Sequence, residues 1–191
     1  MLKVFIDTET TGLDPKKHGI IAMSYIIEDK EGNILEEDLI TINTFKYRAK
    51  YAPEALEVNG YTVEQIQSFQ SPKEALDIFD KALCKHSKGE KYIIAAYNAK
   101  FDKEMLEALY EHVYPGRYWK ILSHKVIDTM QTVMLFSDAG LLEVEKHNLE
   151  TVAKHFDFVH IPHNCASDNA VQRAIYKGLC DIIKNSYIKT H

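Results

Sequence analysis

Asp7 and Glu9 are the residues whose types and spacing point most directly to chemistry. They stand at positions i and i+2, directly after the apolar run Val4-Phe5-Ile6. Side chains alternate between the two faces of a strand, so both carboxylates are expected on one face. Neighbouring carboxylates repel each other unless a cation lies between them, and oxygen ligands suit magnesium or manganese rather than zinc or copper. The pair predicts half of a divalent-metal site, with two solvated acids at a strand end as the alternative.

A third carboxylate, Asp102, follows a second apolar run from Tyr92 to Tyr97. The β-branched and aromatic residues of this run are typical of a buried strand. Asn98 comes next and is expected to cap a helix, which places Asp102 in or near the first turn of that helix. The positive end of the helix dipole favours a negative charge there, so helix capping is the alternative to metal binding for Asp102.

His163 precedes the last helical pattern of the chain, at 168–185, and Asp168 is the first residue of that pattern. At about 100° per residue, two helical positions five apart diverge by about 140°, so the two side chains could not share one face of a helix. Pro162 interrupts regular structure just before them. If both residues serve one site, His163 is expected in the loop before the helix.

The elements that would position these residues follow from apolar periodicity. Strands are predicted at 2–7, 20–27, 34–42 and 92–97. Helices are predicted at 72–86, 102–112, 128–136, 149–156 and 168–185. Three successive strands, followed by helices and a further strand, are typical of a mixed β-sheet flanked by α-helices, in the α/β or α+β class.

The four acids and the histidine, in this order, resemble the DEDDh group of DnaQ-like 3′-to-5′ exonucleases, which includes the proofreading subunit of bacterial replicative DNA polymerase. The motifs are Asp-x-Glu-Thr-Thr-Gly from Asp7, Asn-x-x-Phe-Asp ending at Asp102, and His-x-x-x-x-Asp from His163 to Asp168. They span nearly the whole chain. The resemblance implies a ribonuclease H-like fold and a single exonuclease domain over residues 1–191.

The resemblance also implies a mechanism with two divalent ions, Mg²⁺ or Mn²⁺. Asp7 would bridge both ions, Glu9 and Asp168 would complete the shell of the first, and Asp102 would hold the second, largely through water. His163 would take the proton from the attacking water. The product would be nucleoside 5′-monophosphates, released one at a time from a DNA 3′ end in proofreading, repair or DNA turnover.

A further set of residues is expected to contact the terminal nucleotides. These residues are Thr10, Gly12, Val58, Asn59, Asn98 and Phe101. Phe101 and Val58 are candidates to stack on the last bases or wedge them apart, with core packing as the alternative for Phe101. The family more often has His-Gly-Ile where Asn59-Gly60-Tyr61 stands here, and Ala at the position of Cys165. A helix opening at Asp128-Thr129 also agrees with the family.

Bulk properties are compatible with such an enzyme. A net charge of −5 over 191 residues argues against binding long duplexes through many phosphate contacts, but not against gripping a single-stranded or frayed 3′ end. The three cysteines lack metal or disulfide spacing, and no apolar stretch is long enough to span a membrane. We therefore expect a cytoplasmic protein without membrane contact. The resemblance to the proofreading subunit also implies a DNA polymerase as a partner.

Two other functions would fit parts of this pattern. An exoribonuclease of the same group would carry the same catalytic residues and would differ in how its pocket treats the 2′-hydroxyl. A catalytically silent nucleic-acid-binding or polymerase-partner module could retain the fold. Such a module would lack a metal ligand or the general base, and none is missing here.

Three minor patterns have simpler explanations. The cluster His155, His160, His163 and Cys165 matches no zinc module in its spacing, and His160 is expected at the surface or beside a metal ligand. The segment 131–136 resembles a peptide that binds the sliding clamp, but a packed helix is expected there. Scattered surface charges, rather than phosphate contacts, are the commoner explanation for Lys100, Lys103, Lys120, Lys125 and Arg173.

Overall fold

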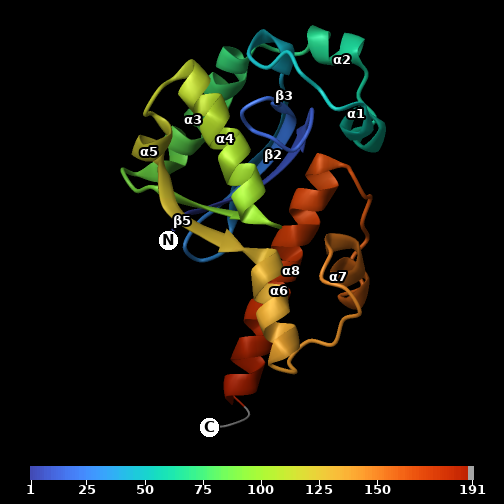
Figure 1. Cartoon of the computed structure of the whole chain (residues 1–191). Coiled ribbons are helices and arrows are strands. Elements are labelled where there is room, and N and C mark those ends of the chain that lie inside the picture. The colour runs from blue at the N-terminus through green and yellow to red at the C-terminus, as the bar shows by residue number, and fades with distance from the viewer. Residues whose placement is uncertain (189–191) are drawn as a thin grey trace.

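A mixed five-stranded β-sheet forms the centre of the molecule (Figure 1). The computed structural model describes the backbone of residues 1–188 and the side chains of residues 1–185. The strand order is β3-β2-β1-β4-β5; β1, β2 and β3 are antiparallel neighbours, whereas β4 and β5 run parallel to β1. The strands are β1 (Lys3–Thr10), β2 (Ile20–Glu28), β3 (Ile34–Thr41), β4 (Tyr92–Ala96) and β5 (Leu122–Asp128).

Helices cover both faces of this sheet (Figure 1). They are η1 (Thr44–Lys46), α1 (Pro53–Asn59), α2 (Val63–Ser68), α3 (Pro72–Ser87), α4 (Ala99–Val113), α5 (Tyr118–Ile121), α6 (Thr129–Asp138), α7 (Leu149–His155) and α8 (Cys165–Ile188). The second strand, β2, is buried at every residue. Complete burial of a strand is expected when helices cover both faces of its sheet.

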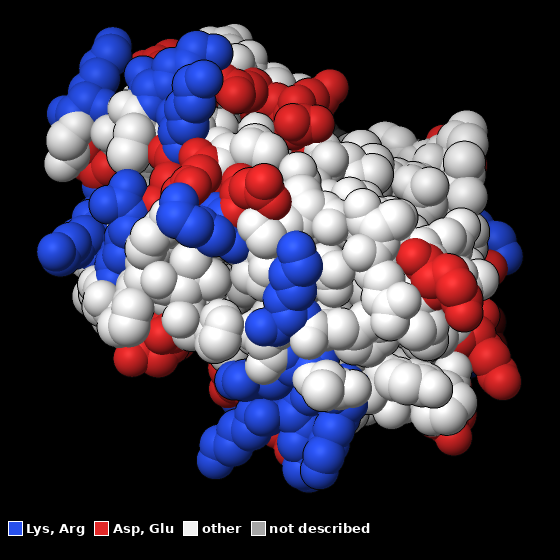
Figure 2. Space-filling view, turned by 90° about the horizontal axis from the view of Figure 1, so that it is seen from above, with Lys and Arg blue, Asp and Glu red and all other residues white. Residues whose placement is uncertain are grey.

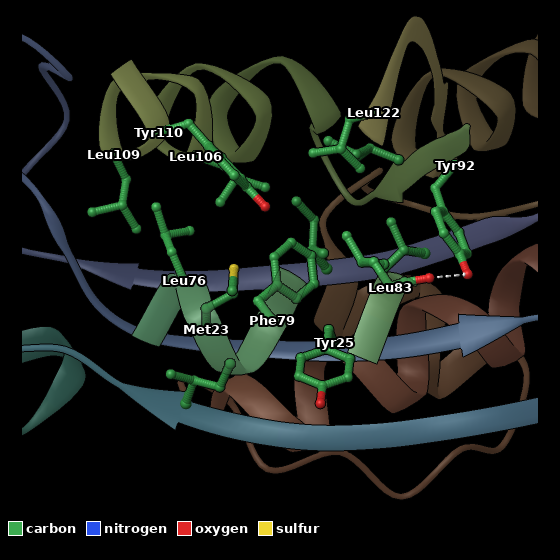
Figure 3. Close-up of a cluster of buried hydrophobic side chains, with 14 of the residues drawn as sticks. Met23, Tyr25, Leu76, Phe79, Leu83, Tyr92, Leu106, Leu109, Tyr110 and Leu122 are labelled. Atoms are coloured by element: carbon green, nitrogen blue, oxygen red, sulfur yellow. Dashed lines mark hydrogen bonds between the residues drawn. The ribbon is translucent and has the colours of Figure 1, made fainter. Parts of the chain in front are cut away.

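The larger core lies between the sheet and the helices α3 and α4. Figure 3 shows Leu76 and Phe79 of α3 and Leu106 of α4 packed with Met23 and Tyr25 of β2. The Phe79 and Tyr25 rings are 5.2 Å apart between centroids. The start of α3 is set locally, because Ser71 and Glu74 form a reciprocal capping box and Pro72 occupies the first turn.

Helix α8 packs on the opposite face of the sheet. There Phe5 of β1 contacts Tyr176 of α8, with 5.6 Å between ring centroids, and Ile26 and Ala95 join the same cluster. A third cluster links α8 to α6 and α7. Because α8 contacts β1 and β2 directly, it can bring a side chain from this face to the end of β1.

The sequence-based prediction missed one strand and several short helices, and it misplaced the ends of other elements. Strand β5 was missed because its polar residues Ser123, His124 and Lys125 break the apolar pattern, as is common at the edge of a sheet. The short helices α1, α2 and α5 were also missed. Strand β1 continues three residues beyond Asp7, and α4 and α8 each begin three residues before their predicted starts.

The segment 131–136 lies within α6, as expected. Val133 and Phe136 are buried against α8, so this segment is neither extended nor free to bind a clamp. Among the described residues, no helix is both long enough and apolar enough to cross a membrane.

Candidate active site

The alternation of side chains along β1 organises the candidate site. Phe5 faces α8, and Asp7 and Glu9 follow it at two-residue steps, so their side chains lie on the α8 side of the sheet. The Thr8 side chain points to the other face of the sheet, where it contacts Asp102 of α4. The end of β1 therefore presents polar groups to both helices.

Three carboxylates meet on the α8 side. Asp7, Glu9 and Asp168 each offer an oxygen, and these oxygens all lie within 4.8 Å of one another. Asp168 lies in the first turn of α8, where the helix dipole favours a negative charge. Among the described residues this is the one His, Cys, Asp and Glu group able to share an ion, which leaves the zinc alternative unsupported.

Asp102 reaches the same strand from the α4 side. It is buried in the first turn of α4, and the Thr8 hydroxyl donates a hydrogen bond of 2.8 Å to Asp102 Oδ1. Asp102 lies outside the group of three oxygens but is close enough for its charge to raise the pKa of Asp7 and Glu9. The structure therefore brings the four predicted acids together around the end of β1.

The predicted capping role of Asn98 was wrong. Asn98 adopts a left-handed conformation with φ of 72°, and its side chain makes no capping hydrogen bond. Asp128 at the end of β5 replaces it, because Asp128 Oδ2 accepts a hydrogen bond of 2.9 Å from the backbone N–H of Ala99. Asp128 also caps α6 through the backbone N–H of Gln131, so one carboxylate fixes the starts of two helices.

Without a cation the four acids are held at an electrostatic cost. Burial, and then the neighbouring carboxylates, raise the pKa of Asp7 well above its ordinary range and that of Glu9 to about 7. Burial also raises the pKa of Asp102 to about 7. Burial raises the pKa of Asp168, and the nearby His160 and His163 oppose that change. An oxygen-only donor set with this excess of negative charge fits a divalent cation.

The two histidines near Asp168 are placed differently. His160 Nε2 lies 2.6 Å from Asp168 Oδ1, and the His160 side chain is largely buried. His163 lies in a turn before α8, as predicted, with φ of 59° and an exposed side chain. The expectation that His160 lies beside a metal ligand is therefore consistent with the structure, and it is His160 that makes the close contact with Asp168.

A cleft of about 460 Å³ opens beside Glu9. Its lining includes five of the six residues expected to contact nucleotides: Thr10, Gly12, Val58, Asn59 and Phe101. The sixth, Asn98, is exposed at the start of α4 and is not part of that lining. Sequence reasoning did not assign Thr8, Leu13, Ala52 and Glu54 to the cleft, which they also line.

Some of these residues shape the cleft through contacts within the chain. The Asn59 amide donates a hydrogen bond to the Thr10 carbonyl, and the Thr10 hydroxyl donates one to the Gly12 carbonyl. Gly12 has φ of 149°, and a Cβ there would lie 2.7 Å from the His18 ring. Phe101 packs partly against the core and also lines the cleft, so both of its expected roles are compatible with the structure.

The basic residues considered for phosphate contacts are not equivalent. Arg173 is an ion-pair partner of the buried Glu28, which removes it from that role. Lys103 pairs with Glu107, whereas Lys120 and Lys125 are exposed. Figure 2 shows separate patches of Lys and Arg beside patches of Asp and Glu on the face seen from above.

Comparison with known proteins agrees with this geometry. The family model RNase_T, described as "Exonuclease", matches residues 4–176. The chain belongs to this exonuclease family. It is a DnaQ-like 3′-to-5′ exonuclease by family, as the motifs had indicated.

Similar proteins are longer than this chain. PolC-type DNA polymerase III of Thermotoga petrophila is 29% identical over 167 residues, which is 87% of this chain and 11% of that protein; the Thermotoga maritima enzyme gives the same values. Escherichia coli exonuclease I in complex with a dT13 oligonucleotide superposes with a TM-score of 0.77 at 16% identity, over 98% of this chain and 43% of that one. Its complex with a dA16 oligonucleotide gives a TM-score of 0.78 at 17% identity, over 100% and 43%. These structures confirm the ribonuclease H-like fold.

Proposed function

We propose that this chain is a divalent-metal-dependent exonuclease that hydrolyses DNA from the 3′ end and releases nucleoside 5′-monophosphates. The observation that carries the proposal is the convergence of Asp7, Glu9 and Asp168 within 4.8 Å, with Asp102 buried against the same strand. The similarity to PolC-type DNA polymerase III and to exonuclease I in complex with DNA oligonucleotides supports DNA as the proposed substrate.

The residues of this chain would hold the ions and orient the substrate. Asp7, Glu9 and Asp168 would hold one ion, and Asp102, together with Asp7, would hold the second. When bound, two such ions supply an activated water and stabilise the leaving oxygen. The cleft beside Glu9 would hold the terminal nucleotide, with Phe101 and Val58 against its base.

A histidine would hold the proton of the attacking water. His163 is proposed for this role, because its turn directly precedes the helix that carries Asp168 and its side chain is free to approach a bound substrate. His160 would support Asp168 through its hydrogen bond. An imidazole suits proton transfer near neutral pH.

The same relatives support a proposal for the biological setting. Proofreading beside a DNA polymerase is the proposed role, with repair or DNA turnover as wider possibilities. The chain spans about a tenth of the PolC-type relatives and less than half of exonuclease I. Residues 1–191 are proposed to act as one exonuclease domain in the cytoplasm.

One assay tests the proposal. Purified protein is incubated with Mg²⁺ or Mn²⁺ and with single-stranded DNA, duplex DNA or RNA of matched sequence, each labelled at either end. We expect stepwise shortening from the 3′ end, DNA cut faster than RNA, and no cleavage in a chelator. Cleavage in the chelator, or digestion from the 5′ end, would contradict the proposal; faster RNA cleavage would reassign the substrate.

A further inference from the structure

Three side chains of α8 hold the backbone of β1. Cys165 Sγ donates a hydrogen bond of 2.9 Å to the Asp7 carbonyl, and Asn169 Nδ2 donates one of 3.2 Å to the Phe5 carbonyl. Gln172 Nε2 donates one of 2.6 Å to the Ile6 carbonyl. We call Cys165, Asn169 and Gln172 the α8 clasp.

Gln172 of the clasp acts where β1 no longer pairs with β4. The pairing of β1 with β4 ends at Phe5 and Ala95, although β1 continues to Thr10. Buried carbonyls without partners are costly, so a donor must come from elsewhere. Gln172 supplies it for Ile6, immediately before the first catalytic acid.

The clasp is also a connected and fully buried network. Asn169 and Gln172 are 0% exposed, Gln172 Nε2 donates to Asn169 Oδ1, and Asn169 Nδ2 donates to the Ser24 hydroxyl. Cys165 Sγ also accepts a hydrogen bond from the backbone N–H of Ser24. The network therefore ties α8 to β1 and β2 together.

Its spacing places the clasp beside the metal ligand of the same helix. Positions 165, 169 and 172 recur at helical steps of four and three, and Asp168 lies between the first two. The face of α8 that carries Asp168 is thus the face that holds the carbonyls of β1. Any shift of α8 along β1 would change the separation of Asp168 from Asp7 and Glu9.

One unfavourable feature points to a role beyond stability. Gln172 Oε1 is buried and has no hydrogen-bond partner among the described residues. An unpaired buried acceptor lowers stability, and such atoms are uncommon in native structures. Such an acceptor beside a cluster of mutually repelling acids is understandable if the amide donor of Gln172 is needed to keep β1 in place.

We infer that Cys165, Asn169 and Gln172 are positioning residues that fix β1 against α8, so that Asp7 and Glu9 stay close to Asp168 before a metal ion binds. The inference rests on the proposed function, because it takes these acids as metal ligands. Groups that orient metal ligands typically change metal affinity by about tenfold to a hundredfold when they are removed. The clasp should therefore affect metal affinity in addition to any effect on overall stability.

The test is calorimetric titration of the DNA-free protein with Mn²⁺. Gln172→Met keeps the length of the side chain but removes the donor, and we expect it to weaken Mn²⁺ binding about tenfold. Asn169→Ala, a smaller change, should weaken binding in the same direction and serves if Gln172→Met does not fold. Cys165→Ser, which keeps a donor and an acceptor, should bind Mn²⁺ as the wild type does.

Leu179→Ala is the matched control, because Leu179 lies in the core on the same helix, away from β1. It should lower the melting temperature yet leave Mn²⁺ affinity unchanged. Equal Mn²⁺ affinity in the wild type, Gln172→Met and Asn169→Ala would overturn the inference about the clasp but not the proposed function. A loss of affinity in Leu179→Ala as large as that in Gln172→Met would do the same. Absence of Mn²⁺ binding by the wild type would overturn the proposed function as well.

Discussion

The carboxylates and the histidines of the candidate site are held in different ways. Asp7, Asp102 and Asp168 lie on a central strand and in the first turns of two long helices that pack on opposite faces of the sheet. His160 and His163 lie in the segment 156–164 between α7 and α8, which has no helix or strand. Within this segment Val159 is 90% exposed, and His163 has a positive φ. The position of the acids is thus set by the fold, whereas that of the histidines depends on a surface segment.

This difference matches a division of roles between metal ligands and a general base. Ligands of a metal ion must be at the correct separation before the ion arrives, because rearranging buried strands and helices is costly. A general base need only reach the attacking water when the substrate is bound, and such contacts often tighten at that stage. The four predictions below test this division, from the largest expected effect to the smallest.

Removing one acid should have the largest effect. Asp7→Asn should lower turnover by about a thousandfold or more, because metal ions supply several kcal/mol of transition-state stabilisation. The same change should leave the metal-free melting temperature unchanged or higher, because it relieves repulsion among the acids. Turnover and thermal melting with and without Mg²⁺ measure both effects. A clearly lower melting temperature in both conditions would make Asp7 a structural residue.

Removing the proposed base should have a smaller effect of a different kind. His163→Ala should lower turnover about a hundredfold and change substrate affinity little, because a proton acceptor acts in the transition state. His160→Ala should act through Asp168 and weaken Mn²⁺ binding instead. Steady-state kinetics and calorimetry separate the two variants. Near-normal turnover in His163→Ala with a severe loss in His160→Ala would transfer the role of base to His160.

Thr8→Val tests the support of the fourth acid. Valine keeps the shape of threonine but cannot donate to Asp102 Oδ1, so Asp102 loses its 2.8 Å hydrogen bond. We expect about a tenfold loss of turnover, as is typical when a partner of a metal ligand is removed. Kinetics at several Mn²⁺ concentrations provide the measurement. Unchanged kinetics would show that α4 alone positions Asp102.

The smallest effect concerns stability and pH without metal. The folded-state pKa values of Glu9 and Asp102 are raised from 4.5 and 3.8 to about 7, so the folded chain binds more protons than the unfolded chain between those values. Stability should therefore fall as pH rises from about 4 to 7, with a decrease in melting temperature of about 4 °C or more.

Thermal melting in a chelator across this pH range provides the measurement. Added Mn²⁺ should raise the melting temperature more at pH 8 than at pH 5, because the cation binds the deprotonated acids. Asp7→Asn should show a weaker dependence on pH. A metal-free melting temperature that rises steadily from pH 4 to 7 would contradict the raised pKa values.

The acids could be predicted from sequence because their signals are local. Alternation placed Asp7 and Glu9 on one face of a strand, and helix periodicity placed Asp102 and Asp168 near helix starts. The resemblance to the exonuclease motifs was needed to assign all four acids to one site. The cap on α4 could not be predicted, because Asp128 arrives from a polar edge strand that showed no apolar pattern. Sequence periodicity does not show which distant residues meet.

The α8 clasp was missed for a related reason. Asn169 and Gln172 look like ordinary polar positions of an amphipathic helix, and only the structure shows that they are buried against β1. The sequence left two positions open for His160, at the surface or beside a metal ligand. It could not choose between them, because the path of a loop does not follow from a periodic pattern. The prediction of the cleft lining was incomplete, because part of the lining comes from α1, a short helix that was not predicted.

Anomalous diffraction from crystals grown with Mn²⁺ and a nucleoside 5′-monophosphate tests the central claim most directly. We expect one Mn²⁺ among Asp7, Glu9 and Asp168 and a second between Asp7 and Asp102, with the base of the nucleotide in the cleft beside Phe101. Saturating Mn²⁺ with no anomalous signal at these acids, or an ion held by the histidines instead, would contradict it.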